Sequence, residues 1–408
     1  MDLTSTQQVL LYGFGIAVIM GAVVNRTNFC TMGAVSDWVN MGDTGRMRSW
    51  MFAIAVAIAG VTLLGLFGAA DISVTSSGSQ AFPPYRTFMF AWPRYLVGGF
   101  LFGIGMTLAS GCSNKTMVRI GGGNIKSLLV LLTLGFGAYL MMYTNFMAYV
   151  FYPWMQPAFV DLSRHGVSDQ SLGGLIAGAF GLGSESTVNY VLGGLLALVL
   201  LVWAFKSVDF RSRFDNILGG AVVGLAVVGA WYVTAGPLGK RWMDDVAFMD
   251  RPPAHAAAQS YTFVSPAGDL FHWVDSGFYS KLLSFGMLAA AGVIVGSLLY
   301  ALVTRQFRFE WFSSWVDAVR HAVGGFLMGV GGVLGMGCTI GQGVTGFSTL
   351  ALGSIMAFGA IVLGAALTMK VEYYRLVYEG EASFMAALLS ALADLRLVPN
   401  ALRRLEAV

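Results

Sequence analysis

Two stretches of the chain, RYLVGGFLFGIGMTLASGC at 94–112 and RHAVGGFLMGVGGVLGMGC at 320–338, are copies of one another. They align without a gap at a constant offset of 226 residues, and eleven of the nineteen positions are identical. A common helix-packing pattern such as G-x-x-x-G explains shared glycines. It does not explain an arginine, a phenylalanine and a cysteine that match in the same frame. The sequence therefore contains an internal duplication.

The composition around these copies is that of a membrane protein. Hydrophobic residues make up 56% of the 408 residues and charged residues only 11%, whereas soluble domains carry about 25% charge. Long apolar segments of this kind are expected in a lipid bilayer. The net charge is only +3, which gives no reason to expect a nucleic acid as partner.

A transmembrane helix needs about 20 mostly apolar residues. We therefore expect an all-α polytopic membrane protein with about nine spans, near 9–25, 49–70, 94–111, 127–149, 188–205, 217–236, 281–303, 320–337 and 347–368. The duplicated spans are the third and the eighth, so they cross the membrane in opposite directions. This is an inverted-topology repeat. We expect its first half within residues 1–150 and its second half within residues 188–370.

Basic residues predict the orientation, because loops rich in Lys and Arg remain in the cytoplasm. They follow the odd-numbered spans, at Arg26, Arg46, Arg48, Lys115, Arg119, Lys126, Lys206, Arg211, Arg213, Arg305, Arg308, Lys370 and Arg375. We expect the N-terminus outside and the C-terminus in the cytoplasm. The first eight residues contain no basic segment, so a cleaved signal peptide is not expected.

Three further segments lie outside the predicted spans. The loops at 151–187 and 237–280 are too long for simple turns, and we expect both to cap the outer face. The tail at 371–408 has helical periodicity. We expect it to be an amphipathic cytoplasmic segment that either lies on the membrane surface or docks a partner.

The three cysteines of the chain lie where the predicted helices are interrupted. Cys112 and Cys338 end the two copies of the repeat, and each is followed by a hydroxyl residue and a glycine-rich polar stretch. Cys30 lies just past an apolar span, in NRTNFCTMG. We expect broken or re-entrant helices at these points, which membranes tolerate only where protein or a wet cavity surrounds them. An odd number of cysteines gives no disulfide framework.

Several kinds of cysteine chemistry are poorly matched by the sequence. The thiols are single and the four histidines are scattered, whereas structural zinc sites have paired ligands. No base is identifiable for a thiolate nucleophile, and no phosphate-binding loop is present. We therefore expect no metal, no cofactor and no enzyme. The alternative for any single cysteine is an inert, small hydrophobic residue.

A thiol is also a soft, weak hydrogen-bond donor, so a soft anion with an exposed sulfur could pass from one neutral thiol to the next. Apolar surroundings favour the neutral thiol, and interrupted helices can offer N–H groups to the anion. The expected path contains Cys30, Cys112 and Cys338. Its expected supporting residues are Arg26, Asn28, Gly111, Ser113, Asn114, Lys115, Gly337, Thr339 and Gln342. The basic residues near this path could instead be ordinary cytoplasmic anchors.

Three motifs carry a family resemblance: NFCTMGAVSDW, LASGCSNKTMVRIGGGN and GMGCTIGQGVTGFS, which surround Cys30, Cys112 and Cys338. With them the chain resembles the YeeE/YedE family of sulfur-transport membrane proteins. The resemblance implies an hourglass-shaped inverted repeat, a bacterial inner-membrane location and a thiosulfate substrate relayed by these three cysteines. It also implies cooperation with a small cytoplasmic sulfur-carrier protein.

The two long outer loops leave the substrate open, because a compact member of that family would not need them. Sulfite, sulfide, a polysulfide or a selenium species are alternatives to thiosulfate. A membrane sensor or scaffold that presents sulfur to a partner is an alternative to a transporter.

Overall fold

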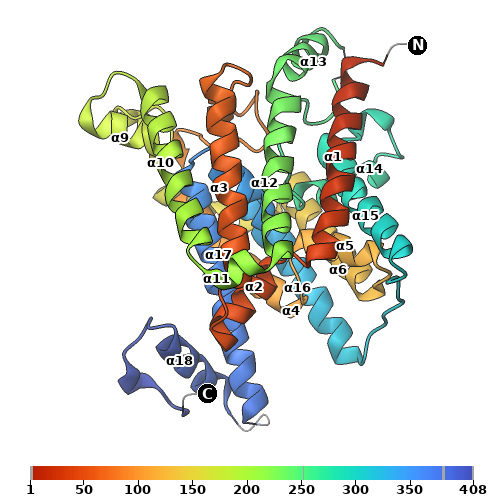
Figure 1. Cartoon of the computed structure of the whole chain (residues 1–408), viewed down its shortest axis with the longest axis vertical. Helices are drawn as coiled ribbons and strands as arrows, with labels where there is room; N and C mark the ends of the chain where they lie inside the picture. The colour runs from red at the N-terminus through yellow and green to blue at the C-terminus, as the bar shows by residue number, and fades with distance from the viewer. Residues whose placement is uncertain (1–2, 251, 379–381, 407–408) are drawn as a thin grey trace.

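The computed structural model describes residues 3–250, 252–378 and 382–406. Figure 1 shows long helices that run side by side along one direction, with shorter helices at both ends of the bundle. Among the described residues the strands form one short antiparallel pair, in which β1 (Met89–Phe90) lies beside β2 (Val160–Asp161). The prediction of an all-α polytopic membrane protein is confirmed.

Nine long helices make up the body of the described part of the chain. They are α1 (Ser5–Thr27), α3 (Gly45–Leu66), α4 (Trp92–Leu108), α6 (Ile125–Tyr143), α10 (Glu185–Phe205), α12 (Phe214–Ala235), α15 (Phe285–Val303), α16 (Trp315–Leu334) and α17 (Leu352–Val377). Each overlaps a predicted span, but the boundaries shift by several residues. Backbone hydrogen bonds made inside a helix satisfy polar groups that lipid cannot satisfy, which is why helices are suited to cross a membrane.

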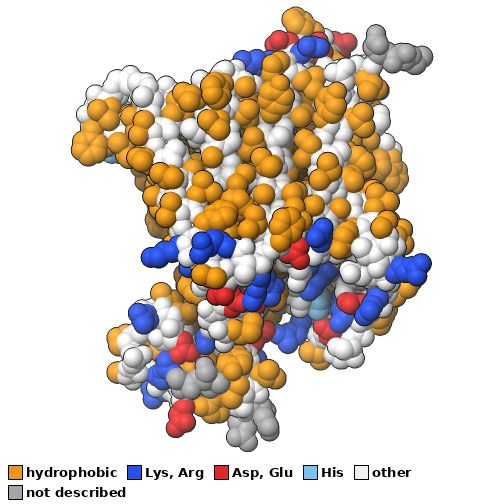
Figure 2. Space-filling model, viewed as in Figure 1, with side chains coloured by type: hydrophobic (Ala, Val, Ile, Leu, Met, Phe, Trp, Pro, Cys, Tyr) orange, Lys and Arg blue, Asp and Glu red, His pale blue; other side chains and the backbone are white. Residues whose placement is uncertain are grey.

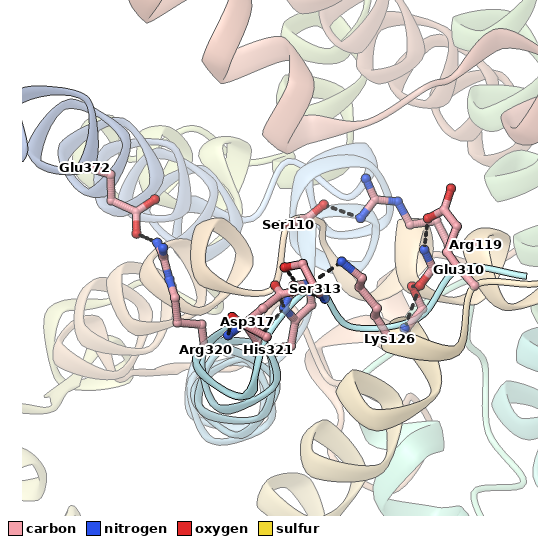
Figure 3. Close-up of polar contacts among 12 residues, drawn as sticks. Ser110, Arg119, Lys126, Glu310, Ser313, Asp317, Arg320, His321 and Glu372 are labelled. Atoms are coloured by element: carbon pink, nitrogen blue, oxygen red, sulfur yellow. Dashed lines mark hydrogen bonds and ion pairs between the residues drawn. The ribbon is translucent and has the colours of Figure 1, made fainter. Parts of the chain in front are cut away.

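Eight helical stretches of the described chain are long and apolar enough to cross a membrane. The exception among the nine is α16, although it contains the second copy of the repeat. Its first two turns carry Asp317, Arg320 and His321, which lower its mean hydropathy. Figure 3 shows these residues engaged with neighbouring segments: Asp317 accepts a hydrogen bond of 2.8 Å from Lys126, and Arg320 pairs with Glu372.

The two copies of the repeat, α4 and α16, pack antiparallel against each other. A Cβ added to Gly98 would lie 2.7 Å from the carbonyl oxygen of Gly331, and one added to Gly324 would lie 2.7 Å from that of Gly105. Gly98 and Gly324 are equivalent in the repeat, and so are Gly105 and Gly331. Each contact is therefore the image of the other when the two copies are exchanged, as an inverted repeat requires.

The same exchange relates the helices that flank this pair. Gly137 on α6 lies against α16, where an added Cβ would be 2.8 Å from the oxygen of Phe326. Gly364 on α17 lies against α4, where it would be 2.4 Å from the oxygen of Phe100. Phe100 and Phe326 are themselves an identical pair of the repeat. Glycine is needed because only a hydrogen atom fits between backbones this close.

Two further helix pairs are related by the same exchange of the two halves. Helix α1 packs against α15, and α12 packs against α3, so α12 is the counterpart of α1 and α15 that of α3. Helix α10 packs against α3 and α9 (Leu172–Phe180) instead. The predicted limits of the two halves, 1–150 and 188–370, stay a prediction.

The segments between and beyond the long helices are themselves mostly helical. At one end of the bundle lie η2 (Ser73–Ser76), α7 (Phe146–Val150), α8 (Tyr152–Met155), η3 (Gln156–Ala158), η4 (Leu162–His165), α9, α13 (Pro237–Ala247), α14 (Ser265–Asp275) and η5 (Ser280–Leu282). At the other lie η1 (Asp37–Met41), α11 (Val208–Ser212), α18 (Phe384–Asp394) and η7 (Asn400–Leu402). The predicted tail begins inside α17, which continues to Val377, and part of it lies outside the described residues.

The charges divide the surface into zones. In Figure 2 apolar side chains cover the middle of the visible face, and charged side chains gather in a band below it and in a smaller group at the top. We call the end of the bundle that carries Arg26, Arg46, Lys126 and Arg213 the basic face. Arg26 pairs there with Asp215 across 3.5 Å. The other end is called the opposite face.

Candidate functional site

Each of the three cysteines begins a short helix after a break. Cys30 precedes α2 (Thr31–Ser36) and Cys112 precedes α5 (Ser113–Gly121), both with extended backbone dihedrals. Cys338 precedes a helical turn that continues into η6 (Gly341–Gly346), a π-helix. All three breaks that were predicted from the sequence are present. The long helices α1, α4 and α16 therefore each stop before a cysteine. The first N–H groups of the helix that follows have no intrahelical partners.

The breaks share one backbone signature. Two residues before each cysteine stands a residue in the left-handed region: Asn28 with φ 51°, Ser110 with φ 57° and Met336 with φ 62°. Left-handed backbone is uncommon for residues other than glycine, and it persists only where the surrounding packing enforces it. The same turn thus recurs at three separate places in the chain and brings each cysteine to the same position relative to its helix.

The sulfur atom of Cys338 faces the backbone of the helix that it precedes. The N–H of Gly341 donates to Cys338 Sγ at 3.3 Å. Gly33 and Lys115 hold the equivalent positions, three residues after Cys30 and Cys112, but these two cysteines make no side-chain hydrogen bond that caps their helices. At the third break, Cys338 Sγ therefore takes the place that a serine or aspartate oxygen holds at an ordinary helix start.

The structure brings the cysteines together from distant parts of the chain. The side chains of Cys30 and Cys112 lie close enough to act on each other, and the side chain of Thr339, the neighbour of Cys338, lies near Cys112. All three cysteines are free and buried, with exposed fractions of 6%, 1% and 0%. The three helix breaks therefore converge on one buried region in the bundle.

This region contains many buried polar atoms that lack a partner. Five belong to the break segments: the hydroxyls of Thr31, Ser113 and Thr339, and the amide oxygens of Asn114 and Gln342. None has a hydrogen-bond partner among the described residues. Since buried polar groups are almost always satisfied, such a cluster indicates a place that water or a polar solute occupies.

Cations lie between this cluster and the basic face. Lys115 donates to the side chain of Asn28, and Arg119 donates at 2.6 Å to the carbonyl oxygen of Ser110, as Figure 3 shows for the latter pair. Both cations act on Cys30 electrostatically. Gly111 leaves room for them, because an added Cβ would lie 3.2 Å from the Lys115 side chain.

Two of the predicted supporting residues, Arg26 and Gly337, contact groups other than the cysteine side chains. Arg26 is half exposed and pairs with Asp215 on the basic face, and no recorded contact joins it to the cysteines. Gly337 lies beside the Gln342 side chain, where an added Cβ would be 3.1 Å away. Gln342 in turn donates at 2.6 Å to the carbonyl oxygen of Gly335, so this pair helps to hold the third break in shape.

Sequence reasoning missed three polar residues near the breaks. Thr31 directly follows Cys30, and Thr262 lies against Gly341, where an added Cβ would be 2.6 Å from its hydroxyl. The hydroxyl of Tyr85, in the loop between α3 and α4, is buried without a partner and acts electrostatically on Cys338. Thr31 belongs to the motif NFCTMGAVSDW around Cys30. Nothing in the sequence around Tyr85 distinguishes it from an ordinary loop residue.

The described residues around the cysteines do not include a cluster of metal ligands. Within the described ranges, no group of three His, Cys, Asp or Glu side chains lies close enough to hold a metal ion. The absence of a metal and of a cofactor stays a prediction. The arrangement of thiols, unpaired hydroxyls and nearby cations is suited to contact an anion rather than a cation.

Comparison with known proteins shows the family to which the chain belongs. Two relatives are named thiosulfate transporter TsuA. The one from Escherichia coli (strain K12) is 24% identical over 326 residues, which cover 79% of this chain and 83% of that protein. The one from Spirochaeta thermophila is 24% identical over 331 residues, which cover 79% of this chain and 86% of that protein. The profile of the sulphur transport family matches residues 26–367, which include the three cysteines and both copies of the repeat. This multi-pass membrane protein therefore belongs to the sulphur transport family.

Proposed function

We propose that this protein carries thiosulfate across the bacterial inner membrane, and that the neutral thiols of Cys30, Cys112 and Cys338 pass the anion along. The observation that carries the proposal is the proximity of the buried Cys30 and Cys112 thiols to each other and to Thr339, the neighbour of Cys338. The names of the two TsuA relatives support thiosulfate as the substrate.

The chemistry of the region suits a soft anion that must lose its water. A thiosulfate ion has a terminal sulfur that accepts weak hydrogen bonds from thiols and oxygen atoms that accept stronger ones. The unpaired hydroxyls of Thr31, Ser113 and Thr339 are donors for those oxygens. Lys115 and Arg119 attract the anion toward the basic face. Burying a charge is tolerated only with such compensation.

The orientation follows from the charge distribution. The basic face is assigned to the cytoplasm, which puts the N-terminus outside and the C-terminus inside. A small cytoplasmic sulfur-carrier protein would then receive the anion at the basic face, next to the end of α17 and α18. Transport into liposomes that contain only this protein separates a transporter from a scaffold that needs such a partner.

The test is uptake of 35S-labelled thiosulfate into proteoliposomes by the wild type and by two variants of Cys112. Cys112→Ala should remain folded, since a small side chain leaves a cavity that costs on the order of 1 kcal/mol. It should lose uptake by about 10- to 150-fold, because a missing hydrogen bond to a charged group costs roughly 1.5–3 kcal/mol. Cys112→Ser keeps a donor but not the soft sulfur, so it should also transport poorly.

The same uptake assay tests the alternative substrates and the alternative of a sensor or scaffold. Uptake of labelled selenite, sulfite or sulfide in preference to thiosulfate would identify another sulfur or selenium species as the substrate. Wild-type protein that is folded and correctly inserted but takes up none of them would favour the sensor or scaffold. Full activity of Cys112→Ala at matched expression would show that this cysteine only packs, and the relay would be wrong.

A further inference from the structure

A second polar site lies near the opposite face, away from the cysteine pair. It is a cavity of about 290 Å³ between the end of α3, the start of α10 and the loop that connects α3 to α4. The volume is at the lower limit of ligand pockets, about 300–1,000 Å³, so the cavity fits a small ion better than a large metabolite. Its charged lining residues are Arg86, Lys240 and Asp71.

Arg86 is held in place but is not neutralised by a direct partner. Its Nε donates to the carbonyl oxygen of Thr349 at 2.6 Å. No described residue forms a hydrogen bond or ion pair with its terminal nitrogens; the acid groups of Asp71 and Asp169 act on it only at longer range. A guanidinium group fixed at one nitrogen, with its other donors free, is prepared to bind an anion with two oxygens.

The floor of the cavity belongs to the same segment that begins at Cys338. Ser348 and Leu350 line the cavity, and Ser348 lies near the end of the helical turns that start after that cysteine. The residue before Arg86 is Tyr85, whose buried hydroxyl has no partner among the described residues and interacts electrostatically with Cys338. The cavity and the third helix break are thus joined through two consecutive residues of one loop.

The cavity also has a route to solution. Asp71 and Lys240 line a neighbouring groove of about 600 Å³ beside α13. Lys240 is exposed, and no recorded ion pair among the described residues involves it. The cavity therefore carries one more positive than negative side chain and connects an exposed lysine to a half-buried arginine.

We propose that this cavity is the outer binding site for a divalent sulfur oxoanion, in which Arg86 binds the anion before it reaches Cys338. The inference rests on the proposed function for the direction of transport. Recognition here depends on charge and on oxygen atoms, whereas the thiols depend on the exposed sulfur. Sulfate should therefore compete for the cavity although it is not passed onward.

The first test measures initial rates of 35S-thiosulfate uptake against concentration in proteoliposomes. Arg86→Gln should raise KM by about 10-fold or more while Vmax stays within about 2-fold, because charge-assisted hydrogen bonds are lost at binding only. Arg86→Lys should lie between Arg86→Gln and the wild type. Asp71→Asn should lower KM by about 2- to 5-fold, because a nearby negative charge is removed. Arg164→Gln is the matched control: this arginine is exposed, beside the loop of Arg86, and pairs with Asp161 outside the cavity.

Two readouts separate binding from folding. The melting temperature in detergent shows whether Arg86→Gln is folded, and unlabelled sulfate should inhibit the wild type competitively but inhibit Arg86→Gln less. A folded Arg86→Gln with unchanged KM, or sulfate that does not compete in the wild type, would overturn the proposal. If Arg86→Gln unfolds, the KM values of Lys240→Gln and Asp71→Asn test the proposal instead. An unchanged KM in both variants would also overturn it.

The outer site and the proposed function can fail separately. If the wild type takes up no thiosulfate, the proposed function fails, and the cavity is then tested by equilibrium binding of labelled thiosulfate to the full-length protein in detergent. Weaker binding to Arg86→Gln than to Arg164→Gln would support the site even then. Equal binding to both variants would reject it.

Discussion

The thiols of Cys30 and Cys112 lie close enough to act on each other, although each cysteine begins a different short helix. Both are buried, and neither forms a disulfide. Proximity of two reduced thiols brings two donors close together, where a single sulfur atom of a substrate could touch both. It also makes the pair open to oxidation, which gives a direct test of the geometry.

Mild oxidation of the purified protein should join Cys30 to Cys112 and leave Cys338 free. The disulfide removes both donors, so uptake should fall to background and return after treatment with dithiothreitol. Mass spectrometry of the digested protein identifies the linked peptides. Cys338→Ala should still form the link, whereas Cys30→Ala should form none. A link to Cys338 in place of Cys112 would contradict the described proximity.

Replacement of Thr339 by valine should separate stability from function. Its hydroxyl is buried and has no partner among the described residues, so a methyl group in its place should leave the melting temperature unchanged or raise it; an unsatisfied buried group costs about 1–3 kcal/mol. Uptake should nevertheless fall by about 10-fold, because the anion loses a donor beside Cys112. Thr339→Ser should keep the activity. A valine variant with full uptake would remove this hydroxyl from the path.

The symmetric contacts between α4 and α16 predict matched effects of two glycine substitutions. Gly98→Ala and Gly324→Ala should each lower stability by about 1–3 kcal/mol, because an added Cβ would lie within 2.7 Å of the backbone of the partner helix. Gly194→Ala on α10 is the control, since nothing lies within 4 Å of its added Cβ. Thermal unfolding in detergent gives the comparison. Strong destabilisation by only one of the first two would mean that the helices are not packed symmetrically.

Lys115→Gln should reduce uptake by roughly 10-fold without unfolding the protein. Lys115 donates to Asn28 and acts on Cys30, so its loss removes a charge that compensates for burial of the anion. High salt should affect the wild type little, because partly buried charges are only weakly screened. Arg211→Gln, at an exposed position of the basic face, is the control. An equal loss in that control would indicate a general surface-charge effect.

The repeat could be predicted from the sequence because Gly98, Gly324 and their neighbours recur in the same order and with similar side-chain sizes in both copies. Small residues that recur in one frame record which backbones must approach closely. The same reasoning found the three helix breaks, since Gly-Cys followed by a hydroxyl residue and further glycines does not favour a continuous helix. It did not place Arg26, whose ion pair with Asp215 depends on how α1 and α12 come together.

The sequence by itself determined the membrane character, the duplication and its inverted direction, and the positions of the breaks. These depend on local composition and on the parity of the spans, which are readable along the chain. Only the tertiary structure decided that Cys30 lies close to Cys112, that Thr339 lies near Cys112, and that Arg86 bonds to Thr349 after the third break. Such contacts join residues far apart in sequence, and they form because helices that bury apolar faces and glycines can pack in only a few ways.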